Sequence, residues 1–249
     1  MIEHKTLYVG DSRSGEMSRT VEVFTSKLRG IGRLSGRKLL DVGCGNGTFT
    51  IALSHGFEEV YGIDVRDDNL EIFRRKVDGN SHFKALNMSA SEMTFPDSFF
   101  DSIITIETLE HVPELQKAAS EIARVLAAGG ELLITVPNRW FPFENHGARI
   151  GSRLWRGRVP LLPYFPWLHR RFAVARVFTV GDLDALFLPE GLIRADHGYL
   201  WPTFEHDGNP FQRFLRPLFG VMRKMEVGSL RFFGSSVVVK YIKSDKKTN

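Results

Sequence analysis

Short apolar segments and amphipathic segments alternate through the middle of the chain, and this alternation predicts strands and helices in turn. The apolar segments that we expect to form strands are 38–42, 59–64, 82–87, 102–106 and 131–136. Between the last two, residues 113–126 repeat apolar side chains at the i, i+3, i+4 spacing of one buried helix face. A shorter helix is expected at 68–77. Because strands that alternate with helices form parallel sheets with right-handed crossovers, the pattern predicts an α/β fold with a doubly wound sheet.

The pattern continues on both sides of this region. We expect an N-terminal helical cap within residues 1–36, a helix at 179–187, and two more strands at 192–196 and 235–242. The helix at 179–187 begins with Thr179, and Asp182 three residues later completes a pair of capping side chains. Segments 139–178 and 201–233 lack regular alternation. We predict that they are lid-forming insertions in a single domain that spans residues 1–249.

The first predicted strand runs into a loop that has glycine at every second position, namely Gly43, Gly45 and Gly47. Without side chains at these positions, a ligand can lie against the turn and the start of the next helix. The second strand then ends in Asp64, where a carboxylate can accept hydrogen bonds from both hydroxyls of a ribose. A glycine loop between a strand and a helix, with an acid at this downstream distance, predicts a nucleoside-type cofactor.

The spacing of the glycines distinguishes this loop from a dinucleotide site. Dinucleotide folds usually have G-x-G-x-x-G, whereas this loop has G-x-G-x-G. Asp41, just before the loop, would repel a pyrophosphate but suits a ligand that carries an ammonium and a sulfonium, such as S-adenosylmethionine. From about Arg37 to Asn138, the chain resembles the class I S-adenosylmethionine-dependent methyltransferases. Besides the loop and Asp64, the matching segments are 95–101, 107–112 and 129–138.

The resemblance implies a Rossmann-like, seven-stranded sheet, mostly parallel, in which strand seven is antiparallel and lies between strands five and six. Cofactor groups are expected at the carboxyl ends of strands one, two and four, with the adenine edge near the end of strand three. The resemblance assigns Asp41 and Gly43 to the methionine part and the backbones of Gly43, Cys44 and Gly45 to the lining of the ligand. It assigns Asp64 to the ribose, Val65, Ser89 and Ala90 to the adenine, and Ile106 and Glu107 to the tip of strand four. Ser89 stands where relatives often have an aspartate, so the backbone of Ala90 is expected to read the adenine edge.

Glu107, Glu110 and His111 follow the fourth strand in the spacing E-x-x-E-H. If this segment turns helical, the three side chains lie on one side of it. Some relatives that act on catechol-like rings or on the terminal ribose of RNA use this set to bind a divalent metal ion, which lowers the pKa of a substrate hydroxyl. Many relatives with the pattern bind no metal, and His111 is alternatively a general base or a pocket-lining residue. His146 is a second candidate base, and the metal site is left open.

An arginine-rich segment lies between Glu144 and Asp182, where the chain has no acid and no lysine. Its basic residues are Arg149, Arg153, Arg156, Arg158, Arg170, Arg171 and Arg176, and aromatic residues interleave with them. This composition fits either a water-facing lid or a surface that makes peripheral contact with an anionic membrane. We do not expect a nucleic-acid partner, because the net charge is only +4 and no RNA-binding module is visible.

Composition sets broader limits. The single cysteine, Cys44, excludes an internal disulfide and fits a reducing cytoplasm. No apolar segment approaches the ~20 residues of a membrane span. We therefore expect a cytoplasmic protein, with peripheral binding at the inner face of the membrane as an option.

Together these features predict a methyltransferase that uses S-adenosylmethionine and methylates an oxygen of a small, partly hydrophobic or lipid-linked acceptor. Two alternatives stay open. One is methylation of RNA or protein, and the other is a non-catalytic protein that binds the cofactor or a partner. The intact Asp41, glycine loop and Asp64 argue against the non-catalytic alternative.

Overall fold

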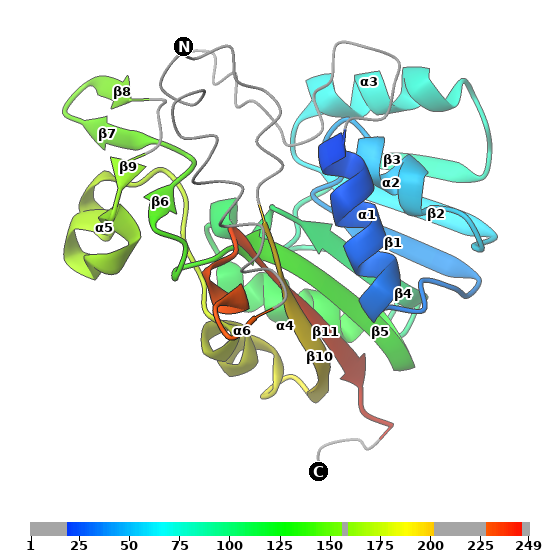
Figure 1. Ribbon diagram of the computed structural model, residues 1–249. Coiled ribbons are helices and arrows are strands. Elements are labelled where there is room, and N and C mark those ends of the chain that lie inside the picture. The colour runs from blue at the N-terminus through cyan, green and yellow to red at the C-terminus, as the bar shows by residue number, and fades with distance from the viewer. Residues whose placement is uncertain (1–18, 156–158, 202–227, 246–249) are drawn as a thin grey trace.

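A seven-stranded sheet forms the centre of the computed structural model, which describes residues 19–155, 159–201 and 228–245 (Figure 1). Its strands are β1 (Lys38–Val42), β2 (Glu59–Asp64), β3 (Phe83–Asn87), β4 (Phe100–Ile106), β5 (Leu126–Pro137), β10 (Leu192–Leu200) and β11 (Ser236–Lys243). They lie in the order β10-β11-β5-β4-β1-β2-β3. The five strands from β1 to β5 pair in parallel, whereas β11 is antiparallel to both β5 and β10. This confirms the predicted fold, including the antiparallel last strand.

Helices cover both faces of the sheet and bury its two apolar surfaces (Figure 1). On one face lie α1 (Arg19–Ile31), α2 (Thr48–Leu53) and α3 (Asp67–Val77), and on the other lie α4 (Leu115–Val125) and α6 (Val180–Phe187). The strand pleat separates the two cores, because successive side chains point to opposite faces. Leu39 of β1 therefore packs in the cluster that contains α1, and Leu40 packs in the cluster that contains α4.

Most predicted boundaries agree with the structure to within a few residues. The largest differences are at β5, which begins at Leu126 and not at residue 131, and at the end of β10. The sequence pattern predicts that this strand ends at Asp196, but it continues to Leu200 because its second half pairs with β11. A register shift between Arg194 and Asp196 interrupts the ladder and obscures the alternation. The predicted cap of α6 is confirmed, since Thr179 and Asp182 bond reciprocally to each other's backbone N–H groups.

Segment 139–178 forms a small lobe at one end of the sheet, which we call the insertion lobe (Figure 1). It contains β6 (Phe143–Glu144), β7 (Ala148–Ile150), β8 (Arg153–Trp155), β9 (Val159–Pro160), η2 (Leu162–Tyr164) and α5 (Pro166–Phe172). β6 pairs with β9 and β7 pairs with β8, in both cases antiparallel. The insertion is therefore more ordered than its irregular sequence pattern indicates. Most of the second predicted insertion, 201–233, and residues 1–18 of the predicted cap lie outside the described residues.

Candidate active site

The glycine loop joins β1 to α2, and its three glycines all have positive φ angles of 76°, 51° and 76° at Gly43, Gly45 and Gly47. At two of these glycines, a neighbouring side chain occupies the space that a Cβ would need. A Cβ on Gly43 would lie 2.2 Å from the side chain of Thr108, and a Cβ on Gly47 would lie 2.1 Å from the ring of Phe73. The glycines thus allow both the backbone turn and the close packing that holds the loop against the sheet.

Asp64, at the end of β2, is fixed beside this loop by two backbone hydrogen bonds. Its Oδ2 accepts from the N–H of Gly45 at 2.9 Å, and its Oδ1 accepts from the N–H of Arg66 at 2.9 Å. Each carboxylate oxygen can accept more than one hydrogen bond, so the bonds orient the group without exhausting it. The side chain is half-buried. Asp64 is therefore placed as the sequence predicts, with capacity left for ribose hydroxyls.

Asp41 lies deeper, in β1, and is 2% exposed. Its Oδ2 accepts a hydrogen bond from the hydroxyl of Thr50 at 2.6 Å. Burial raises the pKa of Asp41 to about 7, although the bond from Thr50 opposes the shift. A carboxyl group that is half protonated near neutral pH would become fully ionised beside a cationic ligand.

This pKa makes cofactor binding a proton-linked event. At about pH 6, below the free pKa of about 7, Asp41 is mostly protonated, and the ammonium of a bound cofactor favours its ionised form. We expect S-adenosylmethionine to displace close to one proton at that pH, and its affinity to rise with pH up to about 7 and to level off above it. Calorimetry in two buffers of different ionisation enthalpy measures the release. Asp41→Asn should lose it, and equal release from the wild type and the variant would contradict the assignment.

The other predicted cofactor residues lie around the same strand ends. Val65 is 66% exposed directly after Asp64, which leaves its apolar surface available to a planar ring. Ser89 and Ala90 are half-buried after β3, and Ile106 is buried at the end of β4. Burial raises the pKa of the Cys44 thiol well above its usual value, so this residue is an inert lining group rather than a nucleophile.

Glu107 marks the point where β4 ends and the chain turns. Its φ angle of 50° is unusual for a residue with a side chain, and its N–H donates to the carbonyl of Thr135 at 2.9 Å. Its Oε1 is buried and has no hydrogen-bond partner among the described residues. Such strained backbone is often retained at functional sites.

Five further side chains extend this region into a mostly buried polar cluster, in which only the His111 side chain is exposed, and which we call the Glu–His cluster. Its members are Glu110, His111, Glu144, His146 and His169. Glu110 and His111 come from the turn η1 (Leu109–His111), and the other three come from the insertion lobe. Glu144 joins two of the histidines, with its Oε2 2.6 Å from Nε2 of His169 and its Oε1 3.5 Å from Nδ1 of His146.

The two acids of the Glu–His cluster have pKa values that are shifted in opposite directions. Burial raises the pKa of Glu110 well above its usual value. Burial would also raise the pKa of Glu144, but His146 and His169 lower it to about 2. Burial lowers the pKa of His111 to about 4. Glu144 is thus paired with two histidines, whereas the described residues offer the buried Glu110 carboxyl group no hydrogen-bond partner.

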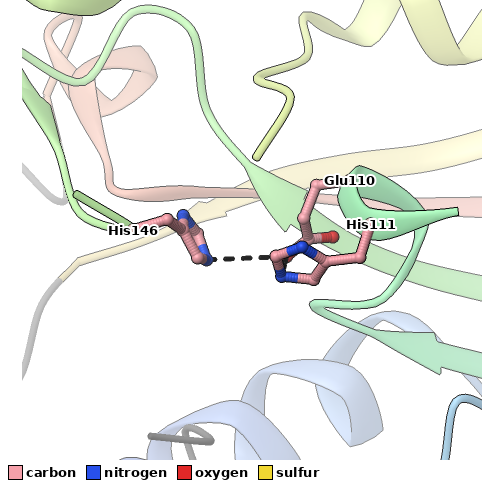
Figure 2. A group of neighbouring side chains, drawn as sticks. All are labelled: Glu110, His111 and His146. Carbon is pink, nitrogen blue, oxygen red and sulfur yellow. Dashed lines mark ion pairs between the residues drawn. The ribbon is translucent and has the colours of Figure 1, made fainter. Parts of the chain in front are cut away.

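The structure groups these residues differently from the expected E-x-x-E-H set. The positive φ of Glu107 keeps that residue out of the η1 turn. The side-chain ligand atoms that do converge, all within 4.8 Å of one another, belong to Glu110, His111 and His146 (Figure 2). Both candidate bases are therefore in one place, with ring centroids 5.4 Å apart. His169 was not expected here, because nothing in the local sequence pairs it with Glu144.

A cavity of about 870 Å³ opens beside the Glu–His cluster. Glu110, His111 and His169 lie in its wall. The rest of the wall is mixed, with apolar residues such as Leu115, Val174, Phe178 and Leu186 and with Arg139, Arg170 and Arg176. Apolar surface together with polar groups is typical of small-molecule sites, and this wall has a large polar share.

Comparisons with known proteins agree with this architecture. A family model described as a methyltransferase domain matches residues 40–134. The O-methyltransferase rstn1 of Aspergillus nomiae is 34% identical over 137 residues, which are 51% of this chain and 61% of that protein. A demethylmenaquinone methyltransferase of Symbiobacterium thermophilum is 27% identical over 183 residues, which are 66% and 72% of the two chains. One from Staphylococcus aureus is 37% identical over 106 residues, which are 41% and 44%.

Solved structures of the same kind share the fold. An S-adenosylmethionine-dependent methyltransferase from Mesorhizobium loti superposes with a TM-score of 0.61 at 18% identity, over 88% of this chain and 96% of the other. One from Aquifex aeolicus superposes with a TM-score of 0.56 at 18% identity, over 90% and 92%. The fold is thus one that S-adenosylmethionine-dependent methyltransferases share. Residues 40–134 match the model of a methyltransferase domain, which agrees with the resemblance seen in the sequence.

The match to the curated relatives is partial. The chain spans about 61% of the length of the Aspergillus protein and about 44% of the Staphylococcus protein. The family model covers residues 40–134, which run from β1 into β5. The insertion lobe lies beyond that match, so the acceptor has to be inferred from this chain's own residues.

Proposed function

We propose that this protein transfers the methyl group of S-adenosylmethionine to an oxygen atom of a small, partly hydrophobic or lipid-linked acceptor. The observation that carries the proposal is the position of the cavity. It adjoins η1, which directly follows β4, while the glycine loop and Asp64 follow β1 and β2 of the same sheet. The carboxyl ends of parallel strands meet at one edge, where ligands of such sheets bind. Alignment of two bound reactants can contribute about 7–11 kcal/mol to catalysis.

The character of the cavity supports the acceptor class. Apolar side chains would contact a ring or an acyl chain, and the arginines would meet an anionic or oxygen-rich group. Two kinds of relative, an O-methyltransferase and demethylmenaquinone methyltransferases, have names that are compatible with an oxygen acceptor or a quinone-type ring. His111, with a half-exposed side chain in the cavity wall, is the candidate base that an acceptor hydroxyl reaches more easily than the more buried His146.

A methyl-transfer assay with an acceptor panel tests this proposal. The panel contains hydroquinones, catechols, hydroxylated lipids, an RNA mixture and a protein mixture, and isotope from the labelled methyl group is followed by mass spectrometry. We expect label on an oxygen of a small or lipid-linked molecule. Label only on RNA or protein would favour the alternative acceptors. Cofactor binding without turnover over the whole panel would favour a non-catalytic role.

A second observation concerns the surface of the insertion lobe. Trp167, Ile150 and Trp155 are 69%, 66% and 63% exposed, which is unusual for large apolar side chains in one small region. Arg149 and Arg153 are exposed on the same β7–β8 hairpin. We propose that this surface makes peripheral contact with anionic lipid, which would bring the cavity close to a lipid-linked acceptor. Among the described residues, no helix is long and apolar enough to span a bilayer.

Binding to vesicles tests the surface. Each basic residue near an anionic membrane contributes about 1 kcal/mol, so wild-type protein should co-sediment with anionic vesicles more than with neutral ones, and less as salt rises. The double variant Arg149→Glu/Arg153→Glu should lose most of this binding and keep its cofactor affinity. A matched control is Arg75→Glu/Lys117→Glu, at exposed positions on α3 and α4. If the wild type ignores anionic vesicles at low salt, the lobe is better interpreted as a lid over a soluble acceptor.

A further inference from the structure

Glu110 is a buried carboxyl group without the partners that burial normally requires. It is 2% exposed, and neither Oε1 nor Oε2 has a hydrogen-bond partner among the described residues. Buried polar atoms are nearly always hydrogen-bonded, because an unpaired one loses its hydration without compensation. Its position between β4 and α4 is fixed by the η1 turn, so the side chain is directed into the Glu–His cluster by the backbone. A group that is absent from the protein chain itself would complete this site.

Two imidazole nitrogens face the same carboxylate (Figure 2). Nε2 of His146 lies 3.7 Å from Oε1 of Glu110, and Nε2 of His111 lies 3.9 Å from the same oxygen. These separations are too long for hydrogen bonds. They are only slightly longer than the ~3.0–3.5 Å between neighbouring ligand atoms around an ion with bonds of about 2.0–2.2 Å. Small rotations of the side chains would therefore bring all three onto one ion.

The surroundings of His146 support this interpretation. Its second ring nitrogen, Nδ1, lies 3.5 Å from Oε1 of Glu144, and its backbone N–H donates to that oxygen at 2.8 Å. The other oxygen of Glu144 is bonded to His169 at 2.6 Å. A carboxylate behind one nitrogen of an imidazole directs the other nitrogen toward a bound metal and fixes the ring orientation. Nδ1 of His146 itself has no hydrogen bond among the described residues, so Glu144, which is bonded to His169, restrains His146 through its backbone N–H.

We propose that Glu110, His111 and His146 form a binding site for a divalent transition-metal ion. Two imidazoles and one carboxylate suit Zn²⁺, Co²⁺, Mn²⁺ or Fe²⁺, whereas Mg²⁺ and Ca²⁺ prefer oxygen ligands. Three protein ligands leave coordination positions open. Because Glu110 and His111 also line the cavity, these open positions are available to water or to an oxygen of a molecule bound there. If Glu110 formed only ion pairs with His111 and His146 at these distances, both of its oxygens would remain without hydrogen bonds.

The proposal changes the role of His111. An imidazole nitrogen that is bonded to a metal has no lone pair with which to accept a proton, so His111 cannot be ligand and base through the same Nε2. The metal site does not depend on methyl transfer, since it is defined by the free protein. Its test can therefore succeed or fail separately from the proposed function.

Titration of Co²⁺ into chelator-treated full-length protein tests the site, with visible absorption and calorimetry as readouts. We expect one equivalent to bind with d–d bands typical of nitrogen and oxygen ligation, and Zn²⁺ to displace it. Glu110→Gln and His146→Ala should weaken binding by at least about tenfold. Glu144→Gln, which removes the charge beside both His146 and His169 but no ligand, should weaken it by about 10–100-fold.

His55→Ala is the matched control, because His55 is an exposed histidine between α2 and β2 that is not part of the metal-ligand group. It should bind Co²⁺ as the wild type does, and thermal melting identifies any variant that is not folded. Absence of stoichiometric binding to the wild type would overturn the proposal. So would binding that folded Glu110→Gln and His146→Ala retain in full.

Discussion

Asp64→Ala is expected to lower the affinity for both S-adenosylmethionine and S-adenosylhomocysteine by about 1–3 kcal/mol, because ribose hydroxyls would lose a charged acceptor. The same change removes the bond from the N–H of Gly45 to Oδ2, so the loop itself loses a restraint. Both effects act in the same direction. Titration calorimetry measures them directly.

The neighbouring Asp67→Ala provides the control for Asp64. Asp67 is an exposed acid in the first turn of α3, and its removal changes the net charge equally without touching the loop. Its affinity should stay close to that of the wild type. Unchanged affinity in a folded Asp64→Ala protein would remove the ribose assignment, whatever the activity of the chain.

Gly47→Ala is expected to have the largest effect on stability. A Cβ at this position would lie 2.1 Å from the ring of Phe73, which is fully buried, and φ is 76°. The left-handed backbone costs a residue with a side chain about 1–2 kcal/mol, and overpacking typically adds about 1–3 kcal/mol. We expect the free energy of unfolding to fall by about 2–5 kcal/mol, measured by denaturant titration.

Gly79→Ala separates the two contributions. Gly79 has nearly the same φ, 72°, but no atom lies within 4 Å of the added Cβ. This variant should lose only the backbone contribution of about 1–2 kcal/mol. If Gly47→Ala and Gly79→Ala are equally stable, the contact between the loop and Phe73 does not determine the packing of the site.

The sheet could be predicted from sequence because its strands carry a local signal. Mainly apolar segments such as 38–42 and 131–136 are buried on both faces of the sheet. Such segments are typical of the inner strands of a parallel sheet. The antiparallel position of β11 came from the family resemblance rather than from the pattern. The continuation of β10 to Leu200 was missed because pairing with a strand far along the chain decides it.

The candidate site could also be predicted only in part. The placement of Gly43 and Asp64 could be predicted, because each ends or follows a strand and the fold brings those ends together; their role in cofactor binding stays a prediction. The partners of Glu110 could not be assigned fully, since His146 reaches it from the insertion lobe. The link between Glu144 and His169 spans 25 residues of irregular sequence and leaves no local pattern.

The most direct test of the account is calorimetry on the wild-type protein with S-adenosylmethionine, S-adenosylhomocysteine and NAD. The glycine loop with G-x-G-x-G spacing, the buried Asp41 and the loop-bound Asp64 together predict a site for a nucleoside that lacks a pyrophosphate. We expect both sulfur ligands to bind at one site per chain and NAD to show no comparable heat. Binding of NAD that equals or exceeds that of S-adenosylmethionine would contradict the assignment.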